Sequence, residues 1–127
     1  MGARNPSPPN GGGDWIVVKP GHWMFEGTGM NQGDGIPGLV GWEFHGLPAT
    51  HLPGLEVVAE GTAFNAGVNP VHWTGTIYPG PKGNFVFNAA TIWWAQGLAS
   101  PPGHILPWSH STRPHGPDPR VQRITEN

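Results

Sequence analysis

The sequence predicts an α/β fold that is rich in β-strands and has one or two short helices near its C-terminus, with a mainly β fold as the alternative. Short apolar runs rich in β-branched and aromatic residues alternate with clusters of Gly and Pro, as strands and turns do. Helix signals occur only late in the chain. The 127 residues include 21 Gly and 16 Pro, yet seven Trp and five Phe argue against disorder. We therefore expect a loop-rich globular domain.

The N-terminal segment, residues 1–13, is expected to be a disordered tail. It contains several prolines and the run Gly11-Gly12-Gly13, and it cannot bury enough apolar surface to repay the entropy of ordering. The domain proper is therefore assigned to residues 14–127. Its first strand is predicted at residues 15–18, a β-branched run that Pro20-Gly21 closes.

Four more strands are predicted from runs of β-forming residues. The first two cover residues 39–44 and 55–61, and Gly41 would let another segment approach the backbone closely. The other two cover residues 71–78 and 84–87, and the turn sequence Pro79-Gly80-Pro81-Lys82-Gly83 joins them.

Two short helices are predicted in the last part of the chain. Asn88 can cap a helix over residues 89–96, which Gly97 would end. Asp118 is a capping residue followed by proline at the first helical position, and it opens a second helix. That helix reaches Asn127 without any C-terminal signal, so we expect a truncated chain.

The charge balance argues against nucleic-acid and membrane partners. Eight acidic and six basic residues give a formal net charge of −2, which offers no attraction for a phosphate backbone or an anionic bilayer. The chain shows no apolar leader and no long apolar run, so we expect a soluble, cytoplasmic protein. The absence of Cys fits a reducing compartment.

Two glutamates are the leading candidates for catalytic residues. Charged residues make up only 11% of the chain, so a carboxylate among aromatic residues is placed there despite a desolvation cost. Glu26 follows Phe25. Glu43 lies between Trp42 and Phe44. Burial would raise the pKa of either carboxylate and suit it for proton transfer near neutral pH. The alternative is a surface glutamate whose aromatic neighbours point inward.

Other catalytic patterns are absent or weak. The seven histidines include no His-Glu-x-x-His pair, although Glu43 and His45 could share one face of a strand. No serine has the glycine neighbours of a nucleophile elbow. Gly27-Thr28-Gly29 lacks the rest of a phosphate-binding loop and predicts a tight turn. We therefore assign no metal to this chain alone.

The tryptophans are predicted mainly to fill the core. They could instead line a pocket or stack on sugar rings, but such a density is more typical of a core with few aliphatic residues. The five considered are Trp23, Trp42, Trp73, Trp93 and Trp94. The last two are adjacent on the predicted helix and cannot face the same way, so one of them could reach a partner surface.

Several segments taken together resemble one known family. They are His22-Trp23-Met24-Phe25-Glu26-Gly27-Thr28-Gly29, Gly38-Leu39-Val40-Gly41-Trp42-Glu43, Thr76-Ile77-Tyr78-Pro79-Gly80-Pro81-Lys82-Gly83-Asn84-Phe85-Val86-Phe87-Asn88-Ala89, Ile92-Trp93-Trp94 and Pro117-Asp118-Pro119-Arg120-Val121. From about residue 21 to residue 127, the chain resembles the C-terminal part of the large (beta) subunit of N,N-dimethylformamidase.

The resemblance implies a partial glutamine-amidotransferase-like α/β domain, hydrolysis of a small amide, and one iron held by two tyrosines and a glutamate. Tyr78 is the only tyrosine, so iron is implied for the complete enzyme and its ligands would lie outside this chain. Glu43 matches an active-site carboxylate that carries a proton, by its place in the Gly-Leu-Val-Gly-Trp-Glu motif. The remaining candidates are Glu26 for catalysis and His22, His45 and Phe85 for substrate binding.

The functional hypothesis is therefore a C-terminal fragment, truncated at both ends, of a dimethylformamidase-like amidohydrolase that is inactive alone. Its expected partners are the rest of the large subunit, a small subunit and a small amide. The alternative is a small Trp-rich β module that binds carbohydrate or docks a protein, and a truncated product without function is a third possibility. Two exposed tryptophans on one flat face would favour the module. Glu43 in a concave site beside an open sheet edge would favour the fragment.

Overall fold

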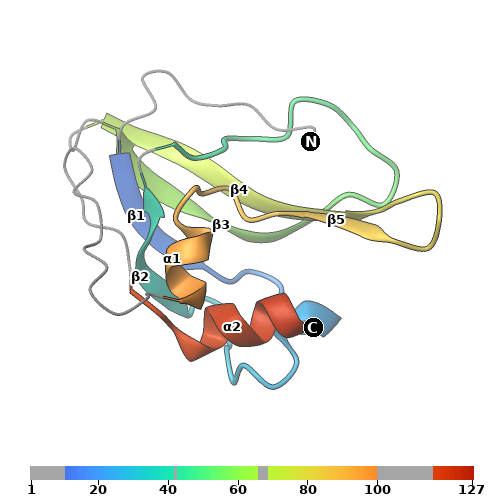
Figure 1. Cartoon of the computed structure of the whole chain (residues 1–127). Coiled ribbons are helices and arrows are strands. Elements are labelled where there is room, and N and C mark those ends of the chain that lie inside the picture. Colours follow the sequence, from blue (N-terminus) through green and yellow to red (C-terminus); the bar gives the residue numbers. More distant parts are fainter. Residues whose placement is uncertain (1–10, 42, 66–68, 100–115) are drawn as a thin grey trace.

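A computed structural model describes residues 11–41, 43–65, 69–99 and 116–127, which form one curled sheet and three short helices (Figure 1). The elements are β1 (Gly11–Ile16), the 3-10 helix η1 (Trp23–Phe25), β2 (Gly35–Gly41), β3 (Glu56–Asn65), β4 (Asn69–Pro79), β5 (Phe85–Asn88), α1 (Trp94–Leu98) and α2 (Pro119–Glu126). No helix in these described ranges is long and apolar enough to cross a membrane.

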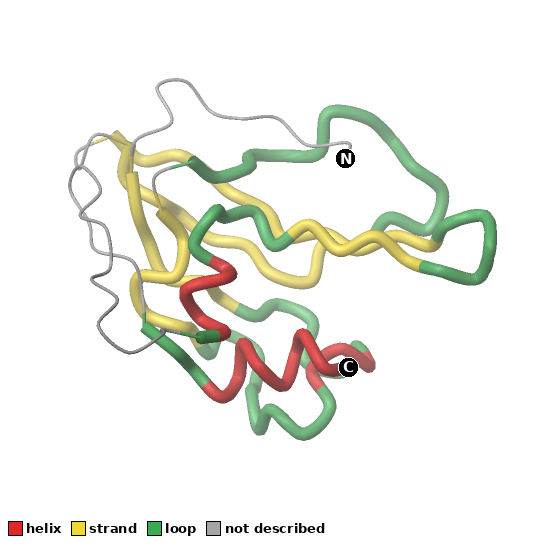
Figure 2. Tube along the Cα trace, in the orientation of Figure 1, coloured by secondary structure: helices red, strands yellow, loops and turns green. Residues whose placement is uncertain are grey.

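The sheet is antiparallel throughout its described strands, in the order β2-β1-β3-β4-β5. β3 and β4 are the longest pair, with Glu56 opposite Ile77 at one end and Asn65 opposite Asn69 at the other. Figures 1 and 2 show that the sheet is curled and that α1 and α2 lie next to each other. The fold is therefore β-rich with two short C-terminal α-helices, and the mainly β alternative describes it better than an α/β layering.

The first two strands begin earlier than the sequence predicted. Gly11–Gly13 belong to β1 rather than to a disordered tail, because β1 lies between β2 and β3 and finds partners on both sides. A side chain on Gly13 would lie 2.9 Å from the Thr62 carbonyl oxygen, so this central strand needs a glycine there. β2 ends at Gly41, and Phe44 forms only an isolated bridge with Thr91.

The helix predicted from an Asn88 cap begins later than expected. Asn88 is the last residue of β5, and its side-chain oxygen accepts a hydrogen bond from the Ala90 amide at 3.0 Å. Ala90 has a φ of 65°, which interrupts any helix at that point. α1 therefore starts at Trp94. Gly97 lies inside α1 rather than after it. An added Cβ there would sit 2.8 Å from Val121 of the neighbouring α2, so the packing of the two helices requires a glycine at this position.

The second helix begins where the sequence predicted. The Asp118 side chain accepts a hydrogen bond from the Arg120 amide at 2.8 Å, and Pro119 occupies the first helical position. Arg120 also pairs with Asp118 through its guanidinium and reaches the Gly35 carbonyl oxygen at 3.1 Å. The Arg120–Gly35 hydrogen bond holds α2 against the edge strand β2.

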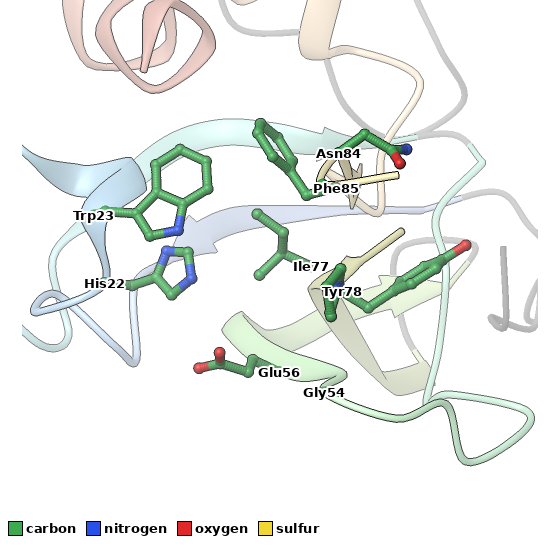
Figure 3. A pocket seen from close by; sticks show the side chains of 10 residues that line it. His22, Trp23, Gly54, Glu56, Ile77, Tyr78, Asn84 and Phe85 are labelled. Carbon is green, nitrogen blue, oxygen red and sulfur yellow. The ribbon is translucent and has the colours of Figure 1, made fainter. Parts of the chain in front are cut away.

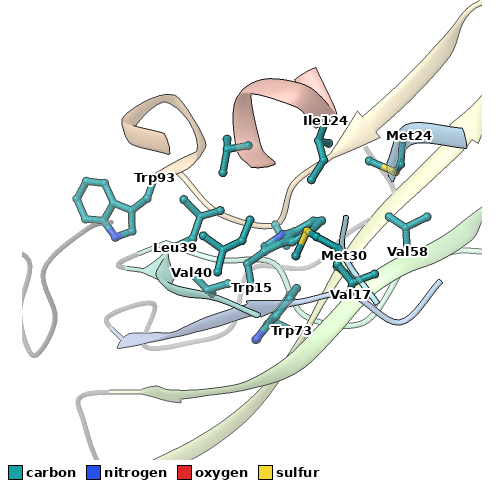
Figure 4. Packing of buried hydrophobic residues seen from close by; sticks show 14 of the residues in the cluster. Trp15, Val17, Met24, Met30, Leu39, Val40, Val58, Trp73, Trp93 and Ile124 are labelled. Carbon is teal, nitrogen blue, oxygen red and sulfur yellow. The ribbon is translucent and has the colours of Figure 1, made fainter. Parts of the chain in front are cut away.

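Trp15 lies at the centre of the hydrophobic core (Figure 4). Its ring stacks on Trp73 with centroids 6.3 Å apart, and its indole nitrogen donates to the Ala89 carbonyl oxygen at 2.9 Å. Among the tryptophans expected in the core, Trp73 and Trp93 are buried, and Trp94 is half-buried. Trp23 is exposed, contrary to expectation. Trp42 lies outside the described residues.

Candidate functional site

An open cleft of about 370 Å³ lies between the η1 segment and the β4–β5 hairpin (Figure 3). It is formed by four short stretches of chain: the start of η1, the turn before β3, the end of β4 and the start of β5. Its volume falls in the range of about 300–1,000 Å³ that is usual for ligand pockets. The lining residues are His22, Trp23, Gly54, Glu56, Ile77, Tyr78, Pro79, Gly83, Asn84 and Phe85.

Two half-exposed aromatic rings form the apolar wall of this cleft. Trp23 is 44% exposed and Phe85 is 50% exposed, and their rings meet edge to face with centroids 4.8 Å apart. A second, narrower cavity of about 110 Å³ shares Trp23, Phe85 and Ile77 and continues toward α1 and α2. The open cleft and a smaller, more apolar cavity therefore meet at the Trp23–Phe85 pair.

His22 presents a defined hydrogen-bond donor to the cleft. Its Nδ1 accepts a hydrogen bond from the Met24 amide at 3.3 Å, so in the neutral ring Nε2 carries the proton. Burial lowers the pKa of His22, Glu56 acts in the opposite direction, and Lys19 adds to the lowering. The neutral ring is therefore favoured.

Glu56 and Lys19 form an ion pair at the rim. The hydrogen bond from Lys19 lowers the pKa of Glu56, so the carboxylate stays charged but has a compensating cation beside it. On the opposite side of the cleft, the Asn84 side-chain oxygen accepts from the Lys82 amide at 3.3 Å. The Asn84 side-chain nitrogen has no partner in the described part of the chain.

The structure brings together two of the three residues proposed for substrate binding. His22 and Phe85 line the same cleft, although 62 positions separate them in the chain. His45 lies elsewhere: its Nδ1 is 2.9 Å from the Asn88 side-chain oxygen, and its carbonyl oxygen accepts from Thr74. The substrate-binding role of all three residues stays a prediction.

Glu26 and Glu43 are both exposed, and neither lines either cavity described above. The carbonyl oxygen of Glu26 accepts hydrogen bonds from Arg123 and Asn127 and so ties the end of η1 to α2. Glu43 lies just beyond β2, where its carbonyl oxygen accepts from Ile92 at 3.3 Å. The burial that would suit these carboxylates for proton transfer is therefore absent in the chain by itself, and their catalytic role stays a prediction.

The residues present do not fit the iron site that the resemblance implies. Within residues 11–41, 43–65, 69–99 and 116–127, no three His, Asp or Glu side chains gather as they would around a metal. Tyr78 is the single tyrosine of the whole chain, whereas that site needs two. Glu43 and His45 follow the end of β2, so the same-face pair expected of a strand does not form there.

Sequence reasoning missed Glu56 and Asn84 as cleft residues. Glu56 opens β3, and its position opposite Ile77 in the sheet brings it to the cleft. Asn84 follows the tight turn of the β4–β5 hairpin, where its carbonyl oxygen accepts from Gly80. The only local signal was the Pro- and Gly-rich turn, which marks a hairpin tip but not what the tip faces.

Neither of the two features expected to distinguish the enzyme fragment from the binding module is present in the described residues. Of the tryptophans placed there, only Trp23 is exposed, so no flat face with two exposed indoles is present. Glu43 is on an exposed loop and not in either cavity. The Gly27-Thr28-Gly29 turn is confirmed, because Thr28 donates to the Phe25 carbonyl oxygen and both glycines have positive φ.

The chain is similar to one known protein family over most of its length. A family model described as "N,N-dimethylformamidase beta subunit-like, C-terminal" matches residues 2–110. The matched range includes the Gly-Leu-Val-Gly-Trp-Glu motif and the whole β4–β5 hairpin, but not α2. No curated protein and no solved structure matches the chain.

Proposed function

Because the chain belongs to the family of N,N-dimethylformamidase beta subunit-like C-terminal domains, we propose that it serves as the C-terminal domain of an amide-hydrolysing large subunit and is inactive alone. The single observation that carries this proposal is the match over residues 2–110. The family is that of a beta subunit-like domain, so the partners would be the rest of the large subunit and a small subunit. The substrate would be a small amide.

The proposal assigns the metal chemistry to sequence outside this chain. The chain is a poor source of iron ligands, because it has a single tyrosine and because no three-ligand group occurs in its described part. The glutamine-amidotransferase-like part of the enzyme would also lie outside, since the described sheet is antiparallel. The β-rich domain would then pack beside that catalytic part and contribute individual side chains to it.

Glu43 is the side chain that we propose to contribute. It lies on an exposed loop just past the edge strand β2, where a neighbouring domain can cover it. Such a cover would remove water from the carboxylate, which favours its use as a proton carrier. Glu26 is less suited because its segment already packs against α2 through Arg123 and Asn127.

The test compares two matched variants in a complete enzyme that contains this domain. Release of dimethylamine from N,N-dimethylformamide is measured for the parent enzyme, for Glu43→Gln and for Glu26→Gln, together with iron content. Loss of a general acid or base costs about 10²–10⁴-fold in turnover, so we expect that loss for Glu43→Gln with iron retained. Glu26→Gln should keep near-parental turnover.

Other results would contradict the proposal. Unchanged turnover in Glu43→Gln would remove Glu43 from the chemistry. Turnover by the 127-residue chain alone, or full turnover by an enzyme from which this domain has been deleted, would contradict its role as a required but inactive domain.

A further inference from the structure

We propose that the cleft between η1 and the β4–β5 hairpin is a binding site for a neutral saccharide. Its ring would pack on Trp23 and Phe85, and its hydroxyl groups would bind His22, Glu56 and Asn84. The inference does not rest on the proposed function, because it concerns a cleft in which neither Glu26 nor Glu43 takes part.

The aromatic wall is the first argument. Trp23 and Phe85 are each about half exposed, although full burial of such rings would stabilise the fold. Aromatic faces carry partial negative charge and attract the weakly positive C–H groups of an apolar ring face. A sugar ring offers such a face, and the cleft has room for a mono- or disaccharide.

The polar groups around this wall are the second argument. His22 offers a donor at Nε2, since its Nδ1 is held by the Met24 amide. Asn84 offers a donor at its side-chain nitrogen. Glu56 binds Lys19 through Oε2 and keeps Oε1 as an acceptor. Two donors and one acceptor therefore border the apolar wall, and hydroxyl groups, which both donate and accept, complement them. Figure 3 shows His22 beside Trp23, with Glu56 and Asn84 at opposite ends of the cleft lining.

The charges argue for a neutral ligand. An anion would gain little from Lys19, because the paired Glu56 carboxylate offsets that charge. A cation would gain little from Glu56, because Lys19 already compensates that charge. An aromatic cage for a methylated ammonium group needs several rings facing one point, and Figure 3 shows the Tyr78 ring directed away from Trp23.

The experiment uses the full chain and follows the indole N–H signals of its seven tryptophans by NMR. The neutral probes are maltose, cellobiose, lactose, xylobiose and mannobiose. Glucose, glucuronate and glucosamine form a second set of rings that differ in charge. We expect at least one neutral disaccharide to shift the Trp23 signal, assigned through Trp23→Phe, with a Kd on the order of 1 mM. Glucose should bind more tightly than glucuronate or glucosamine.

Phe85→Ala and Phe64→Ala are the matched variants. Both phenylalanines are 50% exposed, but Phe64 lies near the end of β3 and lines neither cavity. Phe85→Ala should weaken disaccharide binding about tenfold, the equivalent of about 1.4 kcal/mol, whereas Phe64→Ala should leave it unchanged. The titration of the unmodified chain keeps the test valid if a variant folds poorly.

Three results would overturn the proposal. The first is that no neutral disaccharide shifts the Trp23 signal up to tens of millimolar. The second is tighter binding of glucuronate or glucosamine than of glucose, which would indicate a charged ligand. The third is equal weakening by Phe85→Ala and Phe64→Ala, which would place any sugar binding elsewhere on the chain.

Discussion

Gly41 should be intolerant of any side chain because the Trp93 indole occupies the space that a Cβ would need. An added Cβ would lie 2.0 Å from Trp93 Nε1, about 1.5 Å inside an ordinary contact distance of about 3.5 Å. Trp93 is only 5% exposed and belongs to the core cluster, so it has little room to retreat. The family motif Gly-Leu-Val-Gly-Trp-Glu therefore contains at least one glycine with a packing role.

The magnitude follows from the cost of overpacking, which is about 1–3 kcal/mol. We expect Gly41→Ala to lower the free energy of unfolding by about 2 kcal/mol and Tm by roughly 6–10 °C. Gly21→Ala is the control, because a Cβ there meets nothing within 4 Å, and its effect should stay within about 0.5 kcal/mol. Urea and thermal unfolding of both variants measure the difference.

A double-mutant cycle tests the cause of the destabilisation. The atoms that clash, Nε1 and Cδ1, belong to the indole of Trp93, and alanine has neither atom. In a Trp93→Ala background, Gly41→Ala should cost about 1 kcal/mol less than in the parent chain. An equal cost in both backgrounds, or a cost no larger than that of Gly21→Ala, would refute the packing argument.

Two further predictions concern α2 and the cleft rim. Asp118→Ala should lower the free energy of unfolding by about 2–4 kcal/mol in urea titrations, because it removes a helix cap and leaves Arg120 without its buried partner; the control Asp34→Ala, which alters an exposed turn, should cost far less. Acid should destabilise the fold through two rim groups whose folded pKa is lowered. His22 opposes folding as pH falls through about 6.5, and this loss levels off below its folded pKa. The Glu56–Lys19 pair stabilises the fold above about pH 4.5, and that gain is lost as pH falls through the folded pKa of Glu56. These groups titrate roughly between pH 3 and pH 7. If the free energy of unfolding of His22→Gln and of Glu56→Gln depended on pH over this range as it does in the parent, the assignment would be contradicted.

Local signals predicted the elements whose boundaries depend on nearby residues. Asp118 and Pro119 start α2 because a side-chain cap and a fixed proline φ act within the first helical turn. The turn over residues 79–83 joins β4 and β5 as expected, since its prolines and glycines favour a reversal on their own. The tight turn at Gly27-Thr28-Gly29 is likewise an element that nearby residues determine.

The first residue of β1 and the residue range of α1 could not be predicted from the sequence. Gly11–Gly13 are strand residues only because β2 and β3 supply backbone partners on both sides. α1 starts after the Ala90 kink and keeps Gly97 in its interior because α2 packs there. In both places a contact distant in sequence overrode the local preference.

The family, the β-rich character, the capped C-terminal helix and the candidate residues could be predicted from the sequence, because each depends on residue type and short spacing. Which of the candidates lie together followed only from the three-dimensional fold. His22 and Phe85 share one cleft with Glu56 and Asn84, whereas Glu26, Glu43 and His45 lie outside it. The reason is physical: sheet register and the packing of η1 against α2 set these distances, and both arise from contacts between residues far apart in the chain.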